Sequence, residues 1–118
     1  MAADEEDRTV RSRETQTLGA LACVSGPLSG QRFEVRPEGI YIGRDAALSQ
    51  IVIDDPRVSK RHVWIGSRQG RMVAVDQAST NGTFLNDRGT EGIKEVFLKS
   101  GDTIIVSETE VGQFVYKR

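Results

Sequence analysis

The sequence predicts an all-β domain, and three observations support this prediction. Short apolar runs recur roughly every 8 to 12 residues, as in sandwiches and barrels of short strands. Each run is followed by turn-forming residues such as Gly, Pro, Asp, Asn or Ser. No window of about a dozen residues shows the 3.6-residue period of an amphipathic helix. We therefore expect an all-β sandwich or barrel of short strands.

The apolar runs place the strands in order along the chain. Residues 18–24 form the first run, which Ser25-Gly26-Pro27 closes. The segment 31–36 alternates polar and apolar residues, and this alternation is typical of a strand with one buried face. Further runs that predict strands are 40–42, 51–53, 62–65, 71–76, 83–85, 96–98, 103–106 and 113–116. The runs 62–65 and 71–76 flank a turn and favour a hairpin.

Composition limits the possible classes of protein. The chain has 118 residues, 37% of them hydrophobic, which suits one domain with one core. Its formal net charge of −1 argues against a general nucleic-acid binder. The single cysteine, Cys23, lies in an apolar run and fits a buried side chain in a reducing compartment. No stretch approaches the ~20 apolar residues of a membrane span, and we expect a soluble, cytoplasmic protein.

The chain divides into a tail and a domain. Residues 1–17 are rich in charged side chains and nearly lack large apolar ones. Such a segment cannot bury enough surface to offset its ordering entropy, and we expect a disordered tail. It begins with an acidic stretch and lacks the apolar core of a secretory signal. Residues 18–118 are expected to form the domain.

Three polar clusters follow expected strands and lie in loops. They are Gly43-Arg44, the pair Ser59 and His62, and Ser79-Thr80-Asn81-Gly82. Arginine offers a planar set of donors that suits phosphate or carboxylate. Hydroxyl and amide groups add shorter hydrogen bonds that can hold an anion and the chain carrying it. The clusters therefore predict an oxyanion-binding surface on loops of an all-β domain.

The order and spacing of these clusters resemble the forkhead-associated (FHA) domain. The segment Leu98-x-x-Gly101-Asp102-x-Ile104 resembles a later strand-turn-strand pattern of the same family. The resemblance covers about residues 18–117 and implies a β-sandwich of two antiparallel sheets built from about 11 short strands. It also implies a non-catalytic module that binds phosphothreonine peptides without a cofactor. Its partner would be a phosphoprotein, either a Ser/Thr-kinase substrate or the kinase itself, and we expect the module to be a monomer.

The resemblance also implies roles for individual residues. The expected phosphopeptide contacts are Arg44, Ser59, Lys60, Thr80 and Asn81, with Asn81 on the peptide main chain. Arg57, two residues before the serine, would favour an acidic side chain at the third position after the phosphothreonine. The residues expected to be architectural are Gly43, His62 and Gly82.

The same residues also permit comparison with a hydrolase, a metal-binding protein and a phosphate-independent scaffold. A hydrolase could use Ser59 with His62 and an aspartate such as Asp54 or Asp76, but no G-x-S-x-G elbow is present. Metal binding is disfavoured because one histidine and one cysteine lie far apart in the sequence. A phosphate-independent interaction scaffold remains open as an alternative.

The tail offers a further alternative. Thr15 and Thr17 lie just before the first expected strand, and some bacterial FHA proteins carry a phosphorylatable threonine there. Phosphorylated, such a tail could bind its own domain at high effective concentration. Neither threonine has an acidic residue three places later, since Leu18 and Ala20 stand there. Self-regulation is therefore a hypothesis beside partner binding.

Overall fold

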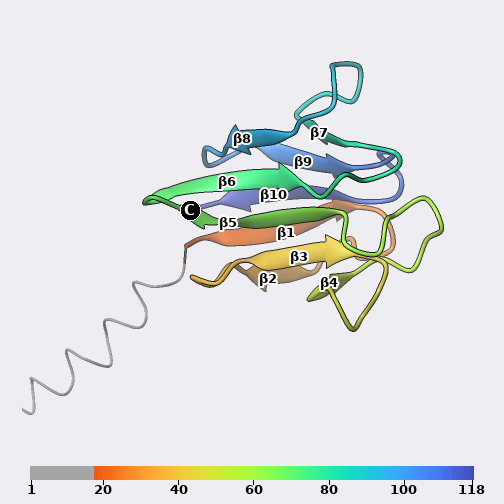
Figure 1. Cartoon of the computed structure of the whole chain (residues 1–118), viewed down its shortest axis with the longest axis horizontal. Coiled ribbons are helices and arrows are strands. Elements are labelled where there is room, and N and C mark those ends of the chain that lie inside the picture. The colour runs from red at the N-terminus through yellow and green to blue at the C-terminus, as the bar shows by residue number, and fades with distance from the viewer. Residues whose placement is uncertain (1–17) are drawn as a thin grey trace, which may run out of the picture.

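The computed structural model describes residues 18–118, which form a β-sandwich of two five-stranded sheets (Figure 1). The first sheet has the order β2 (Arg32–Glu34), β1 (Ala20–Ser25), β10 (Gln113–Lys117), β9 (Thr103–Val106) and β7 (Thr83–Leu85). The second has the order β4 (Ile51–Val52), β3 (Ile40–Gly43), β5 (Val63–Arg68), β6 (Arg71–Asp76) and β8 (Glu95–Phe97).

This architecture confirms the expected fold class, with ten strands in the described residues where about 11 were expected. All the strand pairs are antiparallel except β3 and β4, which run parallel at the edge of the second sheet. No helix in the described part of the chain could cross a membrane. The expected tail, with Thr15 and Thr17, lies outside the described residues.

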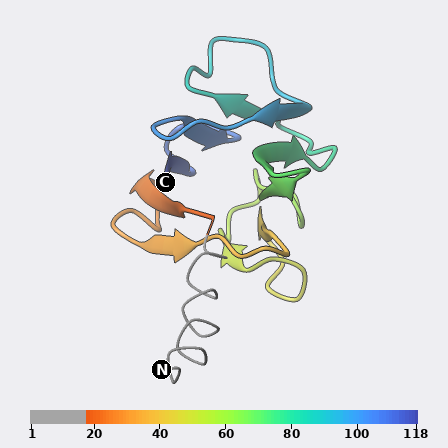
Figure 2. The same cartoon turned by 90° about the vertical axis from the view of Figure 1, so that its left-hand side faces the viewer.

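The core lies between the sheets and consists of buried cross-strand pairs (Figure 2). In the first sheet, Leu21 pairs with Tyr116 and Cys23 with Phe114, and all four side chains are buried. Cys23 is thus the buried small side chain that the sequence predicted. In the second sheet, Ile40 pairs with Ile65 and Ile42 with Val63. Burying a side chain of this size contributes about 1.5–3 kcal/mol, so these pairs fix which face of each strand points inward.

The loops that carry the three polar clusters gather at one end of the sandwich, on the right in Figure 1. They connect β3 to β4, β4 to β5, and β6 to β7, and the loop from β9 to β10 joins them. The β5–β6 hairpin and the C-terminus lie at the opposite end. The sandwich therefore holds loops from distant parts of the sequence on a common base.

The β5–β6 hairpin is confirmed, and its turn leads to the first prediction. Gln69 (φ 56°) and Gly70 (φ 81°) occupy the two central positions between the paired residues Arg68 and Arg71. Two positive φ angles indicate a type I′ turn, which favours Asn-Gly. Gln69→Asn should raise the free energy of unfolding by about 0.5–1 kcal/mol in urea denaturation, because asparagine tolerates this conformation better.

Gly70→Ala serves as the matched control for this turn. It places a Cβ on a residue with positive φ and should lower the free energy of unfolding. If Gln69→Asn left stability unchanged or reduced it, the proposed effect of the turn conformation would be wrong.

Candidate functional site

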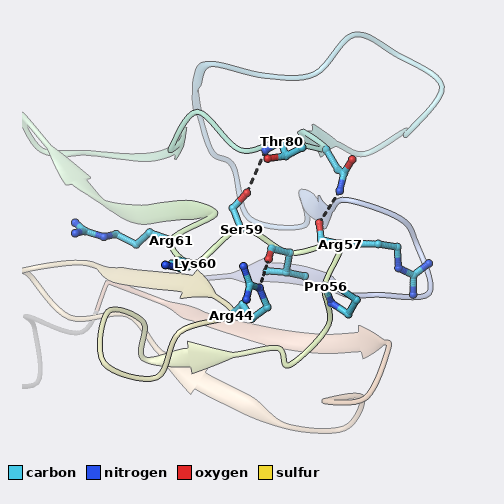
Figure 3. Close-up of a pocket in the computed structure, with 9 residues that line it drawn as sticks. Arg44, Pro56, Arg57, Ser59, Lys60, Arg61 and Thr80 are labelled. Atoms are coloured by element: carbon cyan, nitrogen blue, oxygen red, sulfur yellow. Dashed lines mark hydrogen bonds between the residues drawn. The ribbon is translucent and has the colours of Figure 1, made fainter.

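A depression of about 380 Å³ lies at the loop end of the sandwich (Figure 3). Its walls come from three loops that are well separated in the sequence. They are formed by Arg44, Pro56, Arg57, Val58, Ser59, Lys60, Arg61, Thr80 and Asn81. The structure therefore brings together all six residues that the sequence predicted as peptide contacts, whose roles remain predictions.

Backbone hydrogen bonds join the β3–β4 loop to the β4–β5 loop. The amide of Arg44 donates to the carbonyl of Ser59 at 2.9 Å, and the amide of Asp45 donates to that of Lys60 at 3.2 Å. Gly43 makes this close approach possible, because a Cβ there would lie 2.1 Å from the Lys60 carbonyl oxygen. Any larger residue would push the two loops apart.

Arg44 is held by one of its three guanidinium nitrogens. Nε donates to the carbonyl of Val58 at 2.8 Å, and the side chain is otherwise exposed at the depression. Its two terminal nitrogens make no hydrogen bond to any residue in the range 18–118. One bond thus orients the guanidinium while its outer donors stay available to a ligand.

His62 is fully buried and connects two of the loops that form the site. The amide of Ser59 donates to Nδ1 at 3.1 Å, and Nε2 lies 2.8 Å from the carbonyl oxygen of Gly82. An acceptor at Nδ1 and a donor at Nε2 correspond to the neutral imidazole. Burial lowers the pKa of His62, although the Gly82 carbonyl and the charge of Asp76 oppose this effect.

The β6–β7 loop is organised by the carboxylate of Asp76. Oδ1 accepts from the hydroxyls of Ser79 at 2.6 Å and Thr83 at 2.7 Å, while Oδ2 accepts from the amide of Ser79 at 3.0 Å. The Ser79 hydroxyl in turn accepts from the amide of Gly82. A carboxylate with several donors rigidifies a turn more than a neutral acceptor does. Ser79 therefore shapes the loop from within.

Thr80 and Asn81 connect this loop to the β4–β5 loop. The amide of Thr80 donates to the hydroxyl of Ser59 at 3.1 Å, and Nδ2 of Asn81 donates to the carbonyl of Arg57 at 2.9 Å (Figure 3). The Ser59 hydroxyl acts here as an acceptor, so its own proton remains free to donate. The carbonyl oxygen of the Asn81 side chain is likewise without a partner among the described residues.

Arg57 differs from Arg44, because its guanidinium donates hydrogen bonds to two carboxylates. Nε and Nη2 lie 3.0 Å from the two carboxylate oxygens of Asp55, and Nη1 lies 2.9 Å from Oε2 of Glu110. These bonds lower the pKa of Asp55, and Glu110 has a lowered pKa through its own amide and Arg57. Both carboxylates are therefore ionised at neutral pH.

The sequence identified the residues that line the depression but not those that hold them. Asp76 entered only as a candidate member of a catalytic triad, and Glu110 was not identified at all. Glu110 is 53 residues from Arg57, and no local pattern marks such a pair. No group of three or more His, Cys, Asp or Glu side chains within residues 18–118 is arranged to hold a metal ion.

The fold and the site define a class of protein, a β-sandwich whose loops form a depression lined by basic, hydroxyl and amide side chains. Comparison with known families gives the particular assignment. The model of the FHA domain matches residues 40–107, which is more than half of the chain. The chain therefore belongs to the FHA domain family.

Characterised relatives support the assignment. The chain is 35% identical to an FHA domain-containing protein of Arabidopsis thaliana over 89 residues, or 75% of this chain and 23% of that protein. It is 34% identical to the oxoglutarate dehydrogenase inhibitor of Corynebacterium diphtheriae over 81% of this chain and 61% of the relative. The glycogen accumulation regulator GarA of Mycolicibacterium smegmatis is also 34% identical, over 80% of this chain and 54% of GarA. The chain thus spans between 23% and 61% of the length of these relatives.

Solved structures are similar over most of the described residues. The FHA domain of an Arabidopsis thaliana protein is 31% identical, with a TM-score of 0.72 and 83% and 82% of the two chains covered. Mycobacterium tuberculosis EmbR, solved in complex with a low-affinity phosphopeptide, is 25% identical. Its TM-score is 0.69, with 94% of this chain and 29% of EmbR covered.

The environment of His62 predicts a pH-dependent stability. Its pKa is lower in the folded protein than the ordinary value of 6.5, so the unfolded state binds a proton first as the pH falls. The free energy of unfolding should therefore decrease from about pH 6.5 down to the folded pKa. Because His62 is the only histidine in the sequence, NMR titration of one imidazole can measure both values. A folded pKa at or above the value in urea would contradict this prediction.

Proposed function

We propose that this domain binds phosphothreonine peptides through the depression at the loop end. Arg44, Ser59, Lys60 and Thr80 bind the phosphate, and Asn81 binds the main chain of the peptide. One observation carries the proposal: loops that are fixed by buried hydrogen bonds present donors that have no partner within residues 18–118. Such preorganised donors bind an anion with little ordering cost.

The charges at the depression explain why phosphorylation would be required. The side chains of Arg44, Lys60 and Arg61 are exposed and form no ion pair with a described residue. A phosphothreonine brings a charge of about −1.5 to −2 and three acceptor oxygens, which suit these cations. An unmodified threonine offers one hydroxyl and no charge. Binding should therefore depend on the phosphate.

The geometry of Ser59 and His62 supports binding without catalysis. A nucleophilic serine needs a base within hydrogen-bond reach of its hydroxyl. Here Nδ1 of His62 accepts from the amide of Ser59, and the hydroxyl of Ser59 accepts from Thr80. Since both ring nitrogens are bonded to backbone groups, His62 serves as a structural link and not as a general base.

The proposed partner is a protein that carries a threonine phosphorylated by a Ser/Thr kinase, or the kinase itself. Characterised relatives are named as a regulator and an inhibitor, which fits a recruitment role. A net charge of −1 favours a phosphoprotein over a nucleic acid. We propose that the domain acts as a monomer in the cytoplasm, where it would meet such partners.

The proposal is tested by fluorescence anisotropy with a degenerate phosphothreonine peptide library and matched unphosphorylated and phosphoserine peptides. We expect binding that requires the phosphate and is lost in Arg44→Ala. Removing one partner of a desolvated charge pair costs about 2–5 kcal/mol, or roughly 30-fold or more in affinity.

Arg71→Ala is the matched control for Arg44→Ala. Arg71 stacks on the ring of Phe97 at 3.7 Å in the second sheet and does not line the depression. This variant should bind like the wild type. Equal affinity of wild type and Arg44→Ala would refute the site, and phosphate-independent binding would favour the interaction scaffold.

A further inference from the structure

We propose that the depression has an acidic side just beyond its lining, where Asp55 and Glu110 bind Arg57, and that this side selects peptides with a basic side chain beside the phosphothreonine. This inference rests on the proposed function and names a sequence preference for the same site. It reverses the expectation from Arg57 alone, which was a preference for an acidic side chain.

Carboxylates already bind three of the five N–H donors of the Arg57 guanidinium. Asp55 binds two of its nitrogens in a bidentate pair, and Glu110 binds the third, all at 2.9–3.0 Å. Asp55 Oδ1 also accepts from the amide of Arg57, which fixes the carboxylate in place. An acidic peptide side chain at Arg57 would lie near two carboxylates that already share this one cation. Coulomb repulsion therefore disfavours it.

The charges on the two sides of Ser59 differ in sign. In Figure 3, Lys60 and Arg61 lie on one side of Ser59, whereas the side chain of Arg57 extends to the other side and away from Arg44. The cationic side has three basic residues, Arg44, Lys60 and Arg61, and one nearby acid, Asp45, which gives a formal charge of +2.

The other side has an opposite balance. It contains Arg57 with Asp55 and Glu110 in contact. One cation and two carboxylates give a formal charge of −1. The phosphate is thus attracted to one side of the depression, and an ammonium or guanidinium group to the other.

Glu110 is suited to meet a ligand, because its side chain is 63% exposed whereas that of Asp55 is 21% exposed. Oε2 binds Arg57, and Oε1 contacts only the hydroxyl of Thr109 at 3.5 Å among the described residues. A lysine or arginine of the peptide can bind Oε1 without breaking the pair with Arg57. Glu110 therefore acts as the specificity residue, and Arg57 holds it in position.

The experiment uses the full chain and a phosphothreonine peptide with alanine at the flanking positions. Single Lys or Glu residues are placed in turn at each position from three before to four after the phosphothreonine, and Kd is measured by anisotropy. We expect one or two adjacent positions where Lys binds about 2- to 5-fold more tightly than Glu, the range of an exposed ion pair. Added salt should reduce this ratio.

Variants identify the carboxylates responsible for the preference. Glu110→Gln keeps the size of the side chain and should bring the ratio close to one, while Asp55→Asn with Glu110→Gln should favour Glu by exposing Arg57. Glu108→Gln is the matched control, because Glu108 lies in the same loop and pairs with Arg88 instead. It should leave the ratio unchanged.

The outcomes separate this inference from the proposed function. If phosphothreonine peptides bind but Lys and Glu are equivalent at every position, or Glu is preferred, the acidic side has no role in selection and the inference is wrong. The same holds if Glu110→Gln keeps the preference for Lys. If no phosphothreonine peptide binds, the proposed function itself fails and the inference fails with it.

Discussion

The site depends on the link that His62 makes between Ser59 and Gly82. It connects the loop before β5 to the loop before β7 through two hydrogen bonds inside the protein. Losing this ring would leave the partly buried amide of Ser59 and carbonyl of Gly82 without a partner, and leaving such a group unpaired costs about 1–3 kcal/mol when it is fully buried. The amide of His62 also donates to the carbonyl of Ile42, and the carbonyl of His62 accepts from the amide of Gln77. One residue thus connects strand β3 to the loops that follow β4 and β6.

Around this link, groups that hold the loops are separate from groups that are open to a ligand. Backbone amides, the Asp76 carboxylate and the hydroxyl of Ser79 satisfy one another inside the loops. The outer nitrogens of Arg44 and the hydroxyl proton of Ser59 have no hydrogen-bond partner among the described residues and are available at the surface. Because a phosphate needs several donors at once, binding requires that these groups be oriented before it arrives. The internal hydrogen bonds supply that orientation.

The sequence predicted the fold class and the residues that line the depression, because both depend on local patterns. Apolar runs and turn residues mark strands such as 40–42 and 71–76, and the polar clusters mark the loops between them. The parallel pairing of β3 with β4 was not predicted, because strand direction follows from the path of the loops. Nor were the partners of Asp76 and Arg57 predicted as such. The partners of Asp76 lie within seven residues of it and Glu110 lies 53 residues from Arg57, and neither kind of hydrogen bond leaves a periodic signal in the chain.

Arg57 shows how far a local interpretation can be changed by tertiary structure. Asp55 is two residues away and could have been paired with Arg57 from sequence, but Glu110 comes from the β9–β10 loop, which the sandwich places beside the β4–β5 loop. Asp55 alone binds two of the guanidinium N–H donors, and Glu110 binds a third. The second carboxylate changes the local charge from neutral to negative. The charge that a ligand meets is therefore a property of two loops together, and it follows from the fold that brings them into contact.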